Sequence, residues 1–378
     1  MSYEIILNRY TLGDESAANA LSVGFGGSRS FDDINKNLER ALSLYPLTCS
    51  TINIEKGKPY FKKKDKPLIN FERVSQSDKV WITKQIAIPF DLKNGEFLRF
   101  ALAGENNFVI YAHPIISDSR GLVAFAKAVL SKEYVSTEFY FPKVDDIHLN
   151  IADKFKLRSL IRSKGINILS DKAPLKLKSV SLKSEIIFRL CSGEKVSLLS
   201  FFITTALSLN KTKRKKIAVP YCEKDNFDDI LINDSRIFAF NRGFEPRLKF
   251  YDNAGEIDKF FESIISKKSY RKNSFLFSKL SDNNLDNPIK SKKVYNYIHS
   301  DMCFDVLNTI NDDDIIKTLR FYPSSSFIDN NFGICVVDNA ITISTVLHNE
   351  KGEKLFNDFQ STINLLSKEA ARQFKNLK

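Results

Sequence analysis

A histidine and an aspartate, His113 and Asp118, are the residues of this sequence whose types and spacing best suit proton transfer. Imidazole titrates near neutral pH, so a histidine can take a proton from a hydroxyl or an amine that attacks an electrophile. Ser117 and Ser119 flank the aspartate and add two hydroxyl groups. Such side chains work together only if the elements around them hold them rigidly.

The residues on either side of this stretch predict a strand, a polar corner and a helix. The run 108–111 is β-branched and aromatic, as in a buried strand. Ser117, Asp118 and Ser119 are the candidate N-caps of the helix. After the corner, apolar residues recur at helical spacing at Leu122, Phe125, Ala126 and Val129. A strand, a corner and a helix in this order form a rigid place for reactive groups.

The corner resembles the motif of the condensation-domain and chloramphenicol-acetyltransferase-like family of acyltransferases, which reads His-His-x-x-x-Asp-Gly. The corresponding residues here are His113, Pro114, Asp118 and Ser119, so the first histidine and the aspartate match. In the family, the second histidine is the general base for attack on an acyl thioester. Pro114 occupies that place here, and its side chain cannot accept a proton.

Other segments are similar to the family in the same order along the chain. Residues 30–47 resemble its first helix and the His-Pro-Leu segment that follows, with Tyr45 for the histidine. Residues 89–99 are similar to its Pro-Phe-Asp-Leu and Gly-Pro-Leu-Leu-Arg run. Residues 196–198, 240–247 and 331–333 lie where the family has weaker motifs. The resemblance spans most of the chain, and the order of the segments carries it.

The resemblance implies an α/β (α+β) fold of two chloramphenicol-acetyltransferase-like lobes in a V arrangement, with a tunnel between them and the motif at its centre. We expect an N-terminal lobe at 1-165, a C-terminal lobe at 166-378 and an interdomain crossing over 142–177. In the first lobe, Ser30 and Asp33 predict the start of a helix. In the second, the patterns predict strands at 182–190 and 217–221, helices at 198–209, 257–264 and 355–366, and a hairpin around 338–339.

The resemblance also suggests a role for each residue of the predicted site. His113 is the candidate catalytic base, although adjacent side chains of a strand point to opposite faces, and the alternative is a structural histidine. Asp118 is expected to pair with Arg247 or Arg242 and fix the corner, or to act as a simple helix N-cap. The residues expected to bind substrate are Ser117, Asn331 and Gly333. The alternative for Asn331 and Gly333 is a turn between strands.

The composition is typical of a globular protein. The 378 residues carry a formal net charge of +12, but the lysines are spread along the chain. The densest clusters, 62–64 and 211–216, suit solvated loops, or else a docking patch for an acidic carrier protein or a CoA phosphate. We expect no nucleic-acid partner, because stacking aromatics do not accompany them.

The sequence also predicts where the protein is located and whether it binds a metal ion. No apolar run is long enough to cross a bilayer and the N-terminus lacks a secretory signal, so we expect a cytoplasmic protein with no transmembrane segment. The cysteines are expected to be reduced and mostly buried: Cys49, Cys191, Cys222, Cys303 and Cys335. The residue spacing predicts no metal site.

Two functions are compatible with these observations. The first is an acyltransferase that moves an acyl group from an acyl-CoA or phosphopantetheinyl carrier-protein thioester to a small alcohol or amine, with no permanently bound cofactor. The second is a catalytically degenerate relative that binds or recruits a carrier protein or a partner enzyme. Pro114 separates the two, because it removes the expected base.

Overall fold

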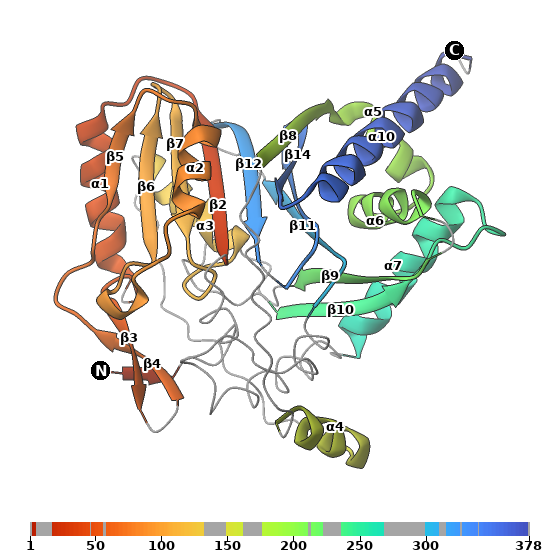
Figure 1. Ribbon diagram of the computed structural model, residues 1–378. Coiled ribbons are helices and arrows are strands. Elements are labelled where there is room, and N and C mark those ends of the chain that lie inside the picture. The colour runs from red at the N-terminus through yellow and green to blue at the C-terminus, as the bar shows by residue number, and fades with distance from the viewer. Residues whose placement is uncertain are drawn as a thin grey trace.

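A computed structural model describes residues 2–4, 17–45, 47–55, 58–131, 149–161, 176–210, 213–221, 236–267, 299–309, 315–325, 327–338 and 340–376 (Figure 1). Within these ranges the chain forms three sheets, and helices cover the two larger ones. The mixed α/β fold class expected from the sequence is therefore confirmed.

The sheet that positions the predicted site has the strand order β12-β2-β7-β6-β5. Its strands are β2 (Ala18–Phe25), β5 (Phe71–Val74), β6 (Leu98–Ala103), β7 (Asn107–Ala112) and β12 (Ile316–Ser324). β12 comes from the C-terminal half of the sequence and pairs antiparallel with β2. The N-terminal sheet is thus completed by a strand from far along the chain.

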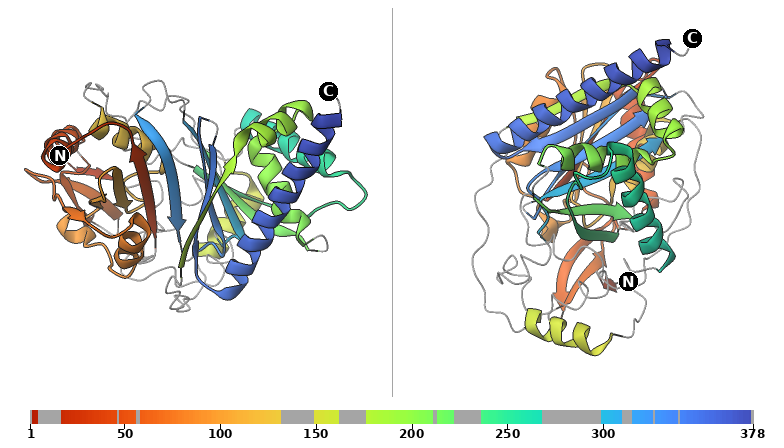
Figure 2. Two further views of the ribbon diagram at one scale, coloured as in Figure 1. Left: turned by 90° about the horizontal axis from the view of Figure 1, so that it is seen from above. Right: turned by 90° about the vertical axis from the view of Figure 1, so that its right-hand side faces the viewer.

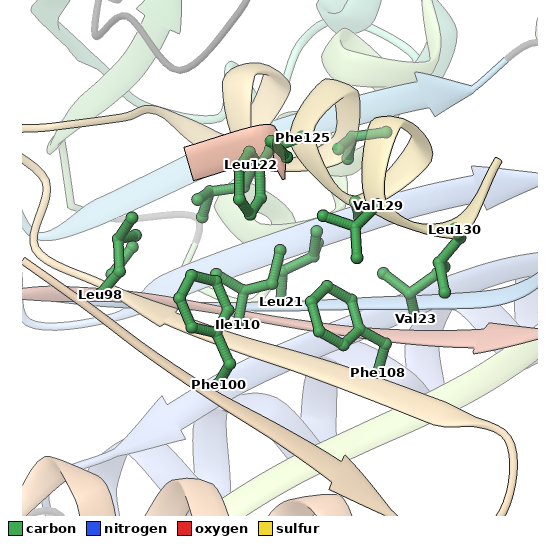
Figure 3. Packing of buried hydrophobic residues seen from close by; sticks show 14 of the residues in the cluster. Leu21, Val23, Leu98, Phe100, Phe108, Ile110, Leu122, Phe125, Val129 and Leu130 are labelled. Carbon is green, nitrogen blue, oxygen red and sulfur yellow. The ribbon is translucent and has the colours of Figure 1, made fainter. Parts of the chain in front are cut away.

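Helices α1 (Phe31–Leu44) and α3 (Ser119–Leu130) pack on one face of this sheet, and α2 (Asp78–Ile86) packs on the other. The hydroxyl of Ser30 accepts a hydrogen bond from the Asp33 amide at 3.0 Å, which confirms the predicted start of α1. Figure 3 shows the apolar side chains of α3 lying over those of the strands, among them Leu122, Phe125, Val129, Phe100, Phe108 and Ile110. Burial of this stripe fixes α3, and with it the corner that precedes the helix.

A second sheet has the order β10-β9-β11-β13-β14-β8. Its strands are β8 (Lys176–Lys183), β9 (Lys215–Tyr221), β10 (Arg236–Arg242), β11 (Met302–Thr309), β13 (Asn331–Val337) and β14 (Ala340–Leu347). The helices α5 (Ser184–Gly193), α6 (Leu198–Ser208), α7 (Phe250–Ser266) and α10 (Glu350–Asn376) share an apolar core with it. β11 and β13 run parallel, whereas β13 and β14 form a hairpin.

The smaller elements lie outside these two layers. β1 (Ser2–Glu4), β3 (Ser50–Glu55) and β4 (Lys58–Lys63) form a three-stranded sheet in the order β1-β4-β3. A 3₁₀ turn, η2 (Leu92–Asn94), precedes β6, and α4 (Ile151–Ile161) lies apart from the two larger sheets (Figure 1).

The two larger sheets meet along β12. Figure 2 shows this strand between the N-terminal strands and the C-terminal sheet, and it contacts β13 and β14. Side chains of β13 alternate accordingly: Phe332 and Ile334 join the core under the C-terminal helices, whereas Cys335 joins the core under α1 and α3. We call this contact between the two sheets the seam.

The helices predicted at 198–209, 257–264 and 355–366, the strand at 217–221 and the hairpin at 338–339 are confirmed in type. The strand predicted at 182–190 is wrong, because the chain turns into α5 after β8 ends at Lys183. Buried Ile187, Leu190 and Cys191 are spaced three and four residues apart, the period of a helix. The predicted lobe boundary at 165/166 lies outside the described residues, as does most of the predicted crossing over 142–177.

Candidate active site

The corner between β7 and α3 is held by hydrogen bonds within its own backbone and to neighbouring segments. At the end of β7, the amide of His113 donates to the carbonyl of Phe97 at 2.9 Å, and the amide of Ile116 donates back to the carbonyl of His113 at 3.1 Å. The Asn19 side chain donates to the carbonyl of Ser117 at 3.2 Å, which ties the corner to β2. The predicted order of strand, corner and helix is therefore correct.

Asp118 is the N-cap of α3. Its carboxylate accepts a hydrogen bond from the amide of Gly121 at 2.8 Å, and only 8% of the residue is exposed. This satisfies one of the free amides of the first helical turn and places negative charge at the positive end of the helix. The N-cap reading of Asp118 is confirmed.

The suggested arginine partner of Asp118 stays a prediction. Arg242 ends β10, and Arg247 follows in the exposed segment before α7, whereas Asp118 is buried.

His113 is buried against aromatic side chains, with 3% of the residue exposed. Its ring lies edge-on to Phe90, which stacks on Tyr111 and lies under the guanidinium of Arg99. The Nδ1 atom of His113 accepts a hydrogen bond from the amide of Ile115 at 3.2 Å. A neutral imidazole that accepts at Nδ1 carries its proton on Nε2 and has no second acceptor. In this arrangement the His113 ring holds the backbone of the corner, and its role as a catalytic base stays a prediction.

The other predicted substrate residues have distinct settings. The Ser117 hydroxyl is fully buried and donates to the carbonyl of Asp118 at 3.1 Å, so it is used within the corner. Asn331 begins β13 and is 2% exposed, and its Nδ2 atom has no hydrogen-bond partner within the described residues. An unpaired buried amide is costly, which makes Asn331 a candidate donor to a ligand.

Gly333 lies at the seam. A Cβ atom built on it would lie 2.0 Å from the carbonyl oxygen of Phe321 in β12, so the missing side chain makes room for a neighbouring strand. Contact of Gly333 with substrate stays a prediction.

Asp305 is a carboxylate beside the corner that the sequence patterns did not single out. It lies in β11, and its carboxylate faces the hydroxyl of Ser119, the first residue of α3. The guanidinium of Arg120 is nearby, but burial outweighs both and raises the pKa of the Asp305 carboxyl to about 6. The available signal was an acidic residue inside an apolar run, Met302 to Leu307.

The cysteines in the described residues are not suited to nucleophilic chemistry. Cys49, Cys191, Cys303 and Cys335 are free and buried, and burial raises the pKa of each thiol. A raised pKa lowers the fraction of reactive thiolate. The prediction of buried thiols is confirmed for these four, and Cys222 lies outside the described residues.

The described part of the chain contains neither a metal-binding cluster of side chains nor a helix that could span a membrane. There, no group of three or more His, Cys, Asp or Glu residues is arranged to hold a metal ion. Within the same ranges, no helix has both the length and the apolar character needed to cross a bilayer.

The two larger sheets, the strand β12 that joins them and the corner before α3 define the fold of condensation domains. No family model and no curated protein matches the sequence itself. A solved structure of the first condensation domain of the CDA synthetase has a TM-score of 0.71 at 12% identity, over 98% of this chain and 96% of that chain.

Two further solved structures are similar over nearly their whole length. The starter condensation domain of rhizomide synthetase RzmA has a TM-score of 0.65 at 11% identity, over 98% of this chain and 95% of that chain. Polyketide synthase associated protein 5 from Mycobacterium tuberculosis has a TM-score of 0.63 at 10% identity, over 97% of this chain and 98% of that chain. The resemblance seen in the sequence is confirmed at the level of the fold.

Proposed function

We propose that this protein transfers an acyl group from a CoA or carrier-protein thioester to an amine or an alcohol. The observation that carries the proposal is the condensation-domain fold over 98% of the chain. The corner between β7 and α3, where Asp118 caps the helix, supports it further. The choice of a thioester as acyl donor and of an amine or an alcohol as acceptor rests on this likeness and on the chemistry of the corner.

Two of the similar structures suggest which thioester to test first. The RzmA starter condensation domain was solved in complex with C8-CoA, and the CDA synthetase domain with a substrate analogue. An eight-carbon acyl-CoA is therefore the first donor to offer. A phosphopantetheinyl thioester on an acidic carrier protein is the second, in line with the net charge of +12.

In this proposal the residues of the corner chiefly position the reactants. His113 and Asp118 fix the turn before α3, and Asn331 offers an unpaired amide to a carbonyl group of the substrate. Holding an amine or a hydroxyl beside a thioester supplies a large part of the rate, because the reaction becomes effectively unimolecular.

The second candidate is a binding or recruitment module that has lost catalysis. It is favoured by Pro114, which stands where a base is expected, and by a His113 ring whose only lone-pair nitrogen is already used. Such a protein would still bind an acyl-CoA or a carrier protein but would release no thiol from it.

The test offers purified protein octanoyl-CoA with a panel of small amines and alcohols. Free CoA is measured with a thiol reagent and the acylated product by mass spectrometry, and a control without acceptor corrects for hydrolysis. Product formed faster than in buffer alone supports the transferase. Binding of octanoyl-CoA by calorimetry without any product supports the module and overturns the transferase.

A further inference from the structure

We propose that Asp305 is the general base of the reaction, taking the proton that the missing second histidine would take. This assignment rests on the proposed acyl transfer and adds to it a catalytic residue from the C-terminal sheet. Four observations support it: the place of Asp305, its access to solvent, its ionisation and an unpaired donor beside it.

Asp305 reaches the motif corner from the opposite side of the seam. β11 lies in the interior of the six-stranded sheet, and the side chains of Cys303, Asp305 and Leu307 share the face that is turned away from Phe304 and the C-terminal helices. On this face the Asp305 carboxylate faces the hydroxyl of Ser119, one residue beyond Asp118, where α3 contacts β11. A strand from the second sheet thus brings a carboxylate to the start of the motif helix.

Asp305 lies deep in the protein, but the residue as a whole is not completely enclosed. Part of the residue remains accessible to solvent, although its neighbours Cys303 and Leu307 on the same face are buried. A deep carboxylate with solvent access can meet a small molecule, which a core carboxylate cannot. This is the setting expected of a catalytic group rather than of a packing residue.

The ionisation of Asp305 suits a base that works near neutral pH. The groups that face it are the hydroxyl of Ser119 and the guanidinium of Arg120, which lower its pKa, and the thiols of Cys303 and Cys335. Desolvation raises the pKa of Asp305 to about 6, so at pH 7 to 8 the group is ionised and is a stronger proton acceptor than an ordinary aspartate.

An unpaired donor lies beside Asp305 on the same face. Asn331 pairs with Cys303 across β11 and β13, and Gly333 pairs with Asp305, so the Asn331 side chain is the diagonal neighbour of the carboxylate. Its Nδ2 atom is buried without a partner in the described residues. A carbonyl group of the substrate would complete this hydrogen bond, next to the proposed base.

The proposed step balances without any further reactant. The nitrogen or oxygen of the acceptor attacks the thioester carbonyl carbon, and the Asp305 carboxylate takes the proton that the acceptor loses. The tetrahedral intermediate then collapses, the carbon–sulfur bond breaks and the thiolate leaves. The Asp305 carboxylic acid returns its proton to the sulfur, which gives an amide or ester, a free thiol and the original carboxylate.

The experiment measures kcat/KM from pH 5 to 8.5 with octanoyl-CoA and the best acceptor of the panel, for wild type, Asp305→Asn, Ser119→Ala and Asp338→Asn. We expect the wild-type value to fall about tenfold per pH unit below pH 6. The kcat/KM of Asp305→Asn should be at least about 100-fold lower than that of wild type, and its fall below pH 6 should disappear. Asp338 lies exposed in the β13–β14 turn, so Asp338→Asn is the matched control and should equal wild type.

Ser119→Ala separates a base from a structural carboxylate. The Ser119 hydroxyl lowers the pKa of Asp305, so its removal raises that pKa, and the acid limb should move to higher pH while activity at pH 8.5 is largely kept. If the acid limb of Ser119→Ala lies at the same pH as that of wild type, the assignment is overturned. This comparison also decides the question if circular dichroism shows that Asp305→Asn does not fold. If the kcat/KM of Asp305→Asn is within threefold of the wild-type value, the assignment is overturned but the proposed function is not. No turnover by wild type overturns the proposed function and this assignment together.

Discussion

A methyl group on Gly333 would lie 2.0 Å from the carbonyl oxygen of Phe321, well inside van der Waals contact. The two residues belong to β13 and β12, so the backbones of the two large sheets approach each other at this point. Phe321 is itself buried in the core under α1 and α3. The seam is therefore built as a close backbone contact, and the position of β11 beside it depends on that contact.

Gly333→Ala should lower the free energy of unfolding by about 1–3 kcal/mol, because a strand backbone cannot move aside as a flexible side chain can. Urea denaturation followed by circular dichroism measures the change. Gly255→Ala is the control, since the Cβ position of Gly255 in α7 is open and alanine favours a helix. Equal stability of Gly333→Ala and wild type would contradict the close contact.

Arg320→Met should lower the free energy of unfolding by about 1–2 kcal/mol, because it removes a hydrogen bond to a charged group that is mostly buried. Arg320 in β12 donates to Asp78 in α2 at 3.1 Å, and Ser22 in β2 donates to the same carboxylate oxygen at 2.7 Å. Ser22→Ala should give a loss of similar size. A double-mutant cycle on the two should show coupling, and strict additivity would mean that the three groups do not act together.

Asp118→Ala should lower the free energy of unfolding by about 1 kcal/mol, the usual cost of losing an N-cap. Asp118→Asn should change it much less, since asparagine caps helices as well as aspartate does. Thermal and urea unfolding of both variants measure the difference. A loss as large in Asp118→Asn as in Asp118→Ala would instead show that the charge matters, as the predicted pairing with Arg247 requires.

The local parts of this structure could be predicted from the sequence, because they depend on residues close together. The stripe from Leu122 to Val129 predicted α3, and the polar residues before it predicted the cap. The run 182–190 was mispredicted because a short continuous apolar stretch fits a strand and a helix equally well. The pairing of β12 with β2 joins segments far apart in the chain, and no local pattern specifies it.

The same distinction holds for the candidate site. The corner from His113 to Asp118 was found because its residues are adjacent in sequence. The burial of His113 among Phe90, Tyr111 and Arg99 depends on tertiary contacts and was not predicted. Asp305 was missed for the same reason, since only the folded seam brings β11 to Ser119.

Asp305 should make wild-type stability depend on pH in a defined direction. Its pKa is raised from the ordinary aspartate value of 3.8 to about 6 in the folded protein, so the folded state binds more protons between these values. Stability from this group is full below pH 4 and is lost as the pH rises through 6. The difference in unfolding free energy between wild type and Asp305→Asn should thus fall by about 3 kcal/mol from pH 4 to 7.5. A constant difference would mean that the pKa of Asp305 is not raised.

The central claim is that the start of α3, faced by Asp305 and Asn331, is the place where an acyl thioester reacts. A crystal structure with a thioether analogue of octanoyl-CoA, in which a methylene group separates the carbonyl carbon from the sulfur, tests it most directly. The account predicts the analogue's carbonyl oxygen within hydrogen-bond distance of the Asn331 amide, with the Asp305 carboxylate beside the carbonyl carbon. An analogue bound on an outer surface, away from the seam, would contradict it.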